Sequence, residues 1–374
     1  MSYLSVLFSA FCSLVQWFTP LSNLSLHTPL HLVFPPKVTS LKPMWDILSH
    51  SETTIDTFSF PSKVTEQATY LQLVGMRFPV LRSLTLGGSL SEIPLDKFSD
   101  FVLAHDHMLE ELDMEYVHSS SLKFDDLSLR EDSLPHLCSF RGGASTLTAM
   151  IQARMNCLTN TLRRLIVGTF RRRDGLLEMK CMFDAMLAFH NGGGSGSARR
   201  FSVLREIELD MQCLWEDEEG LIHAIDCIQK CAACFGSPLE VMTLMVPSRT
   251  RGIKTELLCE LFGHFNKLKV IRLLEETFEG RMCISFQGPR PGTYEYKHNK
   301  GIVESCLRSI ASNCWALEEI IVRCYPPCCQ DDWWIVTRSQ NPTMQERREV
   351  CELIRHEIKE VDVQDRCRPW DSTL

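Results

Sequence analysis

The stretch Leu204-Arg205-Glu206-Ile207-Glu208-Leu209 contains the pattern on which the fold depends. A leucine is followed by two variable residues, an apolar residue, one variable residue and a second apolar residue. Successive residues of a β-strand point to opposite faces, so Ile207 and Leu209 would lie on the same face of a short strand. The pattern therefore predicts a strand with one buried face and one polar face.

The same pattern recurs along the chain, with its leading leucines 25 to 49 residues apart. Such intervals are too long for β-hairpins and are typical of strand–loop–helix units whose strands lie parallel. The copy that begins at Leu137 is degenerate and ends in Gly142-Gly143. The leading leucines are Leu81, Leu109, Leu137, Leu162, Leu204, Leu239, Leu268 and Leu317.

Apolar residues between the copies show helical spacing, as in Leu257, Leu258, Leu261 and Phe262. A single strand–helix unit cannot bury its apolar face alone, so the units must stack. We therefore predict an α/β fold over residues 44–330: an irregular leucine-rich-repeat-like β/α solenoid with a curved parallel sheet and outer helices. A doubly wound sheet is the alternative, although its usual glycine-rich phosphate turn is missing after the first strand.

The beginning of the chain differs in composition from the repeats. Residues 1–36 contain no Lys, Arg, Asp or Glu, and five prolines lie between Thr19 and Pro43. We expect residues 1–43 to be an apolar, proline-rich leader outside the fold; a signal or anchor segment and a mispredicted gene start are the alternatives. No basic residue precedes the apolar run, which disfavours a signal peptide.

A separate element is expected over residues 331–374. Thr343 and Glu346 form a capping-box pattern, which is typical of a helix N-terminus. We predict a C-terminal helix and tail that cap the end of the array, because a last repeat would otherwise expose apolar edges. The helix would carry an apolar stripe made of Val350, Leu353, Ile354, Ile358 and Val361.

The composition excludes several classes of protein. A chain of 374 residues with 44% hydrophobic residues can bury a large core. A net charge of −8 argues against nucleic acid as a partner, because phosphate binding needs an excess of Lys and Arg. The 17 cysteines are odd in number and most lie within apolar patterns, which is typical of buried thiols in a reducing compartment. We expect a cytoplasmic or nuclear protein without a membrane partner.

Three motifs carry a resemblance to a known family. They are Phe78-Pro79-Val80-Leu81-Arg82-Ser83-Leu84-Thr85-Leu86, Leu134-Pro135-His136-Leu137 and Leu48-Ser49-His50-Ser51. Over about residues 44–325, the chain resembles the leucine-rich-repeat portion of the F-box-like proteins abundant in mushroom-forming fungi. The resemblance implies repeats that hold a protein substrate, while an F-box binds a Skp-type adaptor of a cullin ubiquitin ligase. No F-box pattern precedes Met44, so this adaptor is expected only if an unrecognised F-box exists.

A few residues match metal-site motifs in spacing alone. Cys227, Cys231 and Cys234 have the spacing of an iron–sulfur cluster, but they continue the apolar face of a predicted helix. His105 and His107 end another predicted helix, where we expect solvated loop histidines rather than a metal pair. The sequence has no phosphate-binding glycine–lysine loop, serine elbow or zinc-protease helix motif. We therefore expect no enzyme activity, cofactor or metal; the alternative is a metal- or cluster-dependent enzyme that uses the three cysteines.

In a stacked array, the residues between the buried strand positions point out of the concave face of the sheet. We expect this face to bind another protein, which makes the chain a non-catalytic recognition module. Its acidic clusters would suit a basic peptide. The alternatives are that these residues are only solvated strand edges, or that the chain is an orphan gene product lacking its adaptor module. The expected binding residues are Glu111, Asp113, Glu115, Arg141, Arg164, Glu206, Glu208, Asp210, Arg272 and Arg323.

Overall fold

The chain divides into two compact units, residues 1–165 and 166–374, and each is described by itself. The structure is a computed structural model. It describes residues 30–33, 37–38, 54–59, 63–64, 71–72, 74–86, 95–114, 129–168, 175–192, 198–210, 218–235, 238–245, 255–274, 305–323, 332–338 and 351–357.

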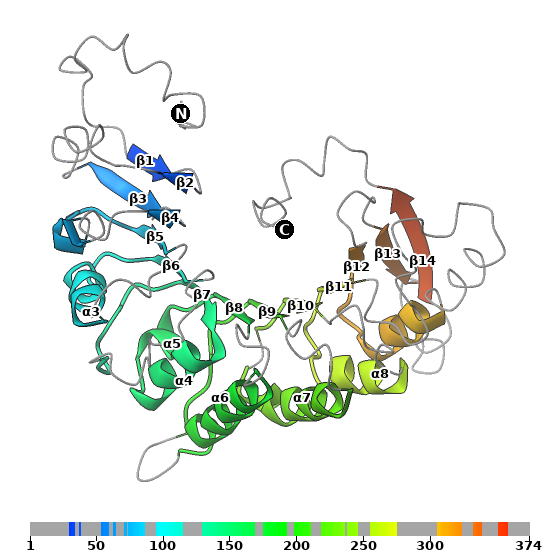
Figure 1. The fold of residues 1–374 in the computed structure, drawn as a ribbon. Coiled ribbons are helices and arrows are strands. Elements are labelled where there is room, and N and C mark those ends of the chain that lie inside the picture. Colours follow the sequence, from blue (N-terminus) through cyan, green and yellow to red (C-terminus); the bar gives the residue numbers. More distant parts are fainter. Residues whose placement is uncertain are drawn as a thin grey trace, which may run out of the picture. The chain divides into compact units, whose positions relative to one another are not determined.

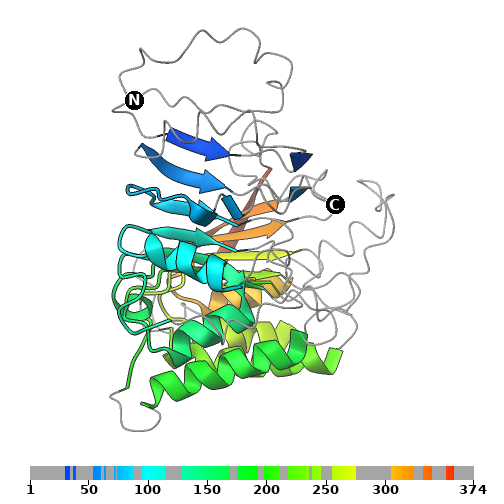
Figure 2. The same ribbon diagram turned by 60° about the vertical axis from the view of Figure 1, so that its left-hand side comes forward.

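The first unit is built on a parallel sheet with helices along one side of it (Figures 1 and 2). Its helices include α3 (Leu95–Ala104), α4 (Ala144–Gln152) and α5 (Cys157–Asn160). A separate parallel pair joins β2 (Lys37–Val38) and β4 (Lys63–Val64). The main strands, in spatial order, are β1 (Leu30–Val33), β3 (Ile55–Ser59), β5 (Ser83–Thr85), β6 (Glu111–Asp113) and β7 (Ser139–Gly143). Strand β1 thus comes from the segment that we expected to precede the fold.

The second unit continues the same alternation of strand and helix. Its helices are α6 (Gly175–His190), α7 (Glu218–Lys230), the short 3₁₀ helix η7 (Cys231–Ala233), α8 (Thr255–Gly263) and a helix over 305–313. Strand β8 (Arg164–Gly168) begins at the end of the first unit. Then follow β9 (Glu206–Asp210), β10 (Val241–Met245), β11 (Val270–Leu274) and β12 (Glu319–Arg323), paired in parallel.

A repeated pair of backbone hydrogen bonds links successive copies of the leucine pattern. The carbonyl of Arg82, which follows the leading Leu81, accepts bonds from the N–H groups of Glu110 at 2.8 Å and Glu111 at 2.9 Å. The same two-bond arrangement occurs at the equivalent carbonyls of Glu110, Cys138, Arg205, Glu240 and Lys269. Every leading leucine is at most 2% exposed. These bonds confirm the predicted α/β fold of stacked strand–helix repeats.

Fourth positions of the copies, together with the equivalent residues of β3 and β13 (Asp332–Arg338), form a continuous buried row within each unit. In the first unit, the row joins Phe58, Leu84, Leu112 and Phe140 in parallel register, and none is more than 4% exposed. In the second unit, it consists of Ile207, Met242, Ile271, Ile320 and Trp334, all at most 2% exposed. The apolar interior predicted from the repeat pattern is therefore present in both units.

In the degenerate copy, a large side chain at one position compensates for a missing side chain at another. Phe140 stands at its fourth position, where the other copies have Leu, Ile or Met, and Gly142 stands at its sixth. A Cβ atom on Gly142 would lie 2.6 Å from Cζ of Phe140. The phenylalanine ring therefore fills the space that the sixth side chain would occupy, and the strand needs a glycine there.

The C-terminal helix that we expected is wrong, because the end of the chain adds strands instead. Strand β13 (Asp332–Arg338) pairs antiparallel with β12, and β14 (Cys351–Glu357) pairs antiparallel with β13. Leu353 lies opposite Val336, and Ile354 lies opposite Ile335. A short apolar run is compatible with either periodicity, so the free edge of β13 decides in favour of a strand.

His105 is also placed differently from the expected solvated loop histidine, because only 1% of it is exposed. Its Nδ1 lies 2.7 Å from the carbonyl oxygen of Phe101, and the N–H of Phe78 donates to its Nε2 at 2.9 Å. A neutral ring with the proton on Nδ1 satisfies both bonds. Burial lowers the pKa of His105, so the neutral form is the stable one here.

Candidate interaction surface on the open face of the sheet

The face of each sheet that is not covered by helices is here called the open face. In the first unit, it carries two rows of polar residues. One row joins Thr57, Ser83, Glu111 and Ser139 in register, and the other joins Ser59, Thr85, Asp113 and Arg141. Parallel strands in register place equivalent residues side by side. The expected binding residues Glu111, Asp113 and Arg141 are therefore neighbours.

Side-chain bonds connect adjacent strands on this polar surface. The hydroxyl of Ser83 donates to Oε2 of Glu111 at 3.0 Å, and Nη1 of Arg141 donates to Oδ2 of Asp113 at 3.3 Å. The Arg141 side chain is only 12% exposed, whereas that of Asp113 is 30% exposed. Glu111 is the exposed carboxylate of the group. A partner would meet Glu111 directly, while Arg141 acts mainly to hold Asp113.

The open face of the second unit carries carboxylates and one ion pair that spans two strands. Glu206, Glu208 and Asp210 lie on β9, and Arg272 lies on β11. Nη1 of Arg272 donates to Oε1 of Glu206 at 3.0 Å, although β10 lies between their strands. The bond shows that both side chains run over the same face of the sheet.

These carboxylates are less exposed than we expected from their positions on the open face. Glu208 is only 9% exposed, and its register neighbour Thr243 is 8% exposed. Glu206 and Asp210 are half-buried. Glu208 is therefore a buried part of the structure, and Asp210 is the better position at which to test binding.

Apolar residues on this open face were missed in the sequence-based prediction. Val241 is half-buried next to Glu206, Val270 is half-buried next to Val241, and Ile321 is half-buried next to Arg272. Ile335 on β13 extends this set, since it lies opposite Glu319. The signal was present in the sequence, because the third position of the copies at Leu239 and Leu268 is valine instead of a polar residue. The second unit thus offers a mixed acidic and apolar surface.

The remaining expected residues are less informative. Arg164 is half-buried in β8. Arg323 ends β12, but its side chain lies outside the described part of the chain, as does the whole of Glu115. Their part in binding stays a prediction.

Two cysteines of the alternative enzyme hypothesis, Cys231 and Cys234, interact through their side chains, but the three sulfur atoms are not all within 4.8 Å of one another. Sγ of Cys231 lies 3.6 Å from the carbonyl oxygen of Phe183, and Sγ of Cys234 lies 3.5 Å from that of Met186. Both thiols are fully buried against α6. Cys227 lies instead beside His223, with 3.6 Å between Sγ and Nε2. The apolar helix face that we preferred to a cluster describes Cys231 and Cys234 well.

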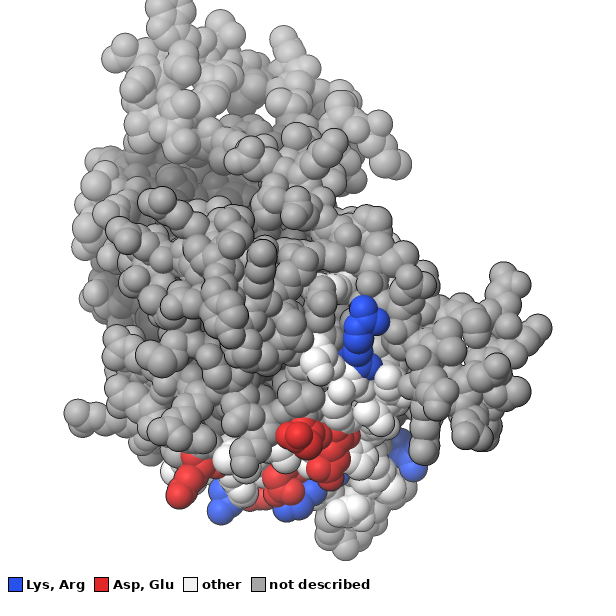
Figure 3. All heavy atoms as spheres, turned by 90° about the vertical axis from the view of Figure 1, so that its right-hand side faces the viewer, with Lys and Arg blue, Asp and Glu red and all other residues white. Residues whose placement is uncertain are grey.

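The surface seen from the side of the second unit has a mixed charge. Acidic side chains gather on its described part, with basic and uncharged side chains beside them (Figure 3). Among the helices with described positions, none has the length and apolar character needed to cross a membrane.

Comparisons with known proteins include a distant structural likeness. No protein-family model matches the sequence, and no curated protein matches it either. Among solved structures, the chain is similar to the leucine-rich repeat-containing protein LegL7 from Legionella pneumophila, with a TM-score of 0.46 and 12% identity, over 79% of this chain and 85% of that one. The fold class follows from the strand order and the repeated hydrogen bonds of the chain itself.

Proposed function

We propose that the chain is a protein-recognition module that binds its partner on the open face of the second unit. The observation that carries this proposal is the mixed surface on strands β9 to β12. Carboxylates of Glu206 and Glu319 lie in one register row with the half-buried Val241 and Val270, and Asp210 lies at the other end of β9. Apolar side chains supply binding energy when they are desolvated, and the charges around them select the partner.

The chemistry of this surface favours a partner segment that carries both basic and apolar side chains. Three half-buried carboxylates (Glu206, Asp210 and Glu319) face one guanidinium, that of Arg272, among the described side chains of these rows. Arg272 is already paired with Glu206, so the field at the surface is negative. A lysine- or arginine-rich segment would be attracted, and a salt-dependent association rate is expected.

The test compares two charge reversals of the same type at different places. Proteins captured by the intact chain are compared with those captured by Asp210→Lys on β9 and by Glu256→Lys on the first turn of α8. We expect one basic partner to be bound by the intact chain and by Glu256→Lys, and to be lost with Asp210→Lys. Binding that survives Asp210→Lys, or that is lost equally with both variants, would overturn the placement on the open face.

A finer role is that of a substrate receptor for a cullin ubiquitin ligase, as the resemblance to F-box-like proteins implies. That role requires binding to a Skp-type adaptor. A direct mixing experiment with purified adaptor tests it, because a receptor should form a stable complex that Asp210→Lys leaves intact. Without that complex, the chain is a recognition module outside the ligase system.

A further inference from the structure

Three different metal-binding side chains meet on one turn of α7. His223, Asp226 and Cys227 are spaced by three and four residues, which places them on one side of a helix. Their ligand atoms all lie within 4.8 Å of one another. Within the described ranges, they are the one set of three His, Cys, Asp or Glu residues whose ligand atoms lie this close together.

The donor set is typical of zinc. An imidazole nitrogen, a thiolate sulfur and a carboxylate oxygen are the three ligand types that Zn²⁺ takes in proteins. Magnesium and calcium prefer oxygen ligands alone, so a site with nitrogen and sulfur favours a transition metal. Three protein ligands would leave one position of a tetrahedral ion open to water or to another ligand.

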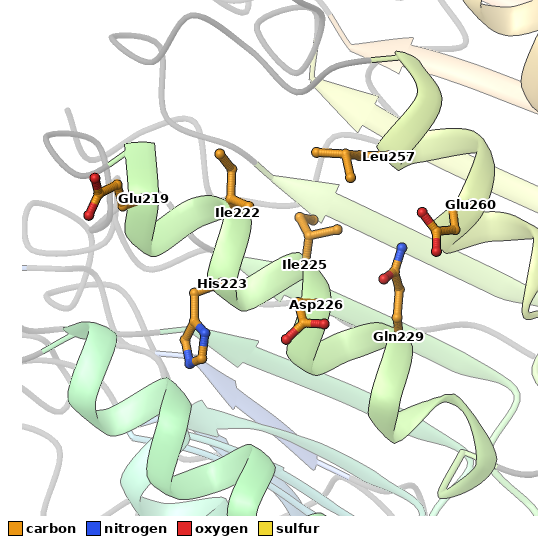
Figure 4. Close-up of a pocket in the computed structure, with 8 residues that line it drawn as sticks. All are labelled: Glu219, Ile222, His223, Ile225, Asp226, Gln229, Leu257 and Glu260. Atoms are coloured by element: carbon orange, nitrogen blue, oxygen red, sulfur yellow. The ribbon is translucent and has the colours of Figure 1, made fainter.

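The thiol of the three-residue group is buried, whereas its other two side chains are accessible. Cys227 is 7% exposed, whereas His223 and Asp226 line an open pocket of about 550 Å³. Both project from the same side of α7 (Figure 4). Leu257 and Glu260 of α8 also line this pocket. An ion could therefore enter from the pocket and reach the thiol beside its wall.

Charged groups of both signs from α7 and α6 surround the thiol. Asp226 and Lys230 of α7 act on the Cys227 thiol together with Asp184 and Lys180 of α6. Asp226 is bonded through Oδ2 to the ammonium group of Lys230, whose side chain is 60% exposed. A divalent ion would take over the role of this ammonium group, and the thiol proton would be released to solvent as the metal–sulfur bond forms.

We propose that His223, Asp226 and Cys227 form an accessible transition-metal site, suited to Zn²⁺, on the helical side of the second unit. The site is separate from the recognition surface, because α7 packs on the face of the sheet opposite to the open face. It also differs from the three-cysteine cluster considered above, since it uses Cys227 without Cys231 or Cys234.

The test uses Co²⁺ as a spectroscopic substitute for Zn²⁺ in the full chain under reducing conditions. We expect one equivalent of Co²⁺ to give a thiolate-to-cobalt absorption band that Zn²⁺ abolishes. Cys227→Ser should remove this band, and His223→Gln should weaken the affinity by more than about tenfold, the loss that even an indirect disturbance of a metal site produces. His223 is accessible to solvent, so His223→Gln tests the site even if Cys227→Ser fails to fold.

The matched control is Cys181→Ser, which removes an exposed thiol on the neighbouring helix α6. It should leave both the band and the affinity unchanged. The proposal is overturned if the intact chain gives no band at one equivalent, if the band persists undiminished in His223→Gln, or if Cys181→Ser removes it.

Discussion

The two units build their buried rows in different ways from the same repeat. The second unit uses two aliphatic positions on strands such as β11, where Ile271 and Leu273 are both buried. In the first unit, strand β7 replaces this pair with Phe140 and Gly142, whose volumes compensate each other. The comparison shows that the repeat specifies the volume of the row rather than the identity of each side chain, as expected for a close-packed core.

The largest effect is expected from removing the aromatic ring in the first unit. Phe140→Ala would leave a cavity that spans two repeat positions, because Gly142 cannot fill any of it. We expect a loss of about 3–5 kcal/mol in the free energy of unfolding. Ile271→Val in the second unit is the comparison, with an expected loss of about 0.5–1.5 kcal/mol. Urea unfolding measures both, and an equal loss would contradict the comparison.

A smaller effect is expected when the glycine gains a side chain. Gly142→Ala places a Cβ against the ring of Phe140, and we expect this overpacking to cost about 1–3 kcal/mol. In a Phe140→Leu background, the same substitution should cost less, since the shorter side chain makes room. A double-mutant cycle by urea unfolding measures the coupling. Identical costs in the two backgrounds would show that the volumes are independent.

The third prediction concerns the pH dependence that His105 gives to the first unit. Its pKa is lowered in the folded state, so the unfolded chain takes up the proton first as the pH falls. The stabilisation is complete above the ordinary value of 6.5 and is lost as the pH falls from there through the lower pKa of the folded state. Thermal unfolding of the intact chain should therefore show a steeper loss below that pH than His105→Gln. Parallel curves would exclude this role of His105.

The last prediction compares the ion pairs on the two open faces. The side chain of Arg272 is 36% exposed, so its ion pair with Glu206 is well solvated, whereas that of Arg141 is 12% exposed. We expect Arg272→Ala to cost at most about 1 kcal/mol. Arg141→Ala should cost more, about 1.5–3 kcal/mol, because it breaks a charged hydrogen bond with a more buried donor. If Arg272→Ala cost more stability than Arg141→Ala in urea unfolding, solvent exposure would not explain the difference between the two ion pairs.

Much of the candidate surface could be predicted from the sequence, because strand alternation decides which residues share a face. Glu111, Asp113 and Arg141 are neighbours as expected, and so are the residues of β9. The burial of Glu208 could not be predicted, since it depends on which side chains of other strands pack around it. The ion pair between Arg272 and Glu206 also required the structure, because their positions are 66 residues apart.

The sequence alone determined the repeat and its strands, because a period of two residues is a local property of the chain. Only the tertiary structure decided which side chains fill the same volume, as with Phe140 and Gly142, and that Cys351–Glu357 becomes a strand at a free edge. It also decided that His105 bonds to Phe78 across 27 residues. These outcomes depend on the energy of contacts between distant segments, which local periodicity does not encode.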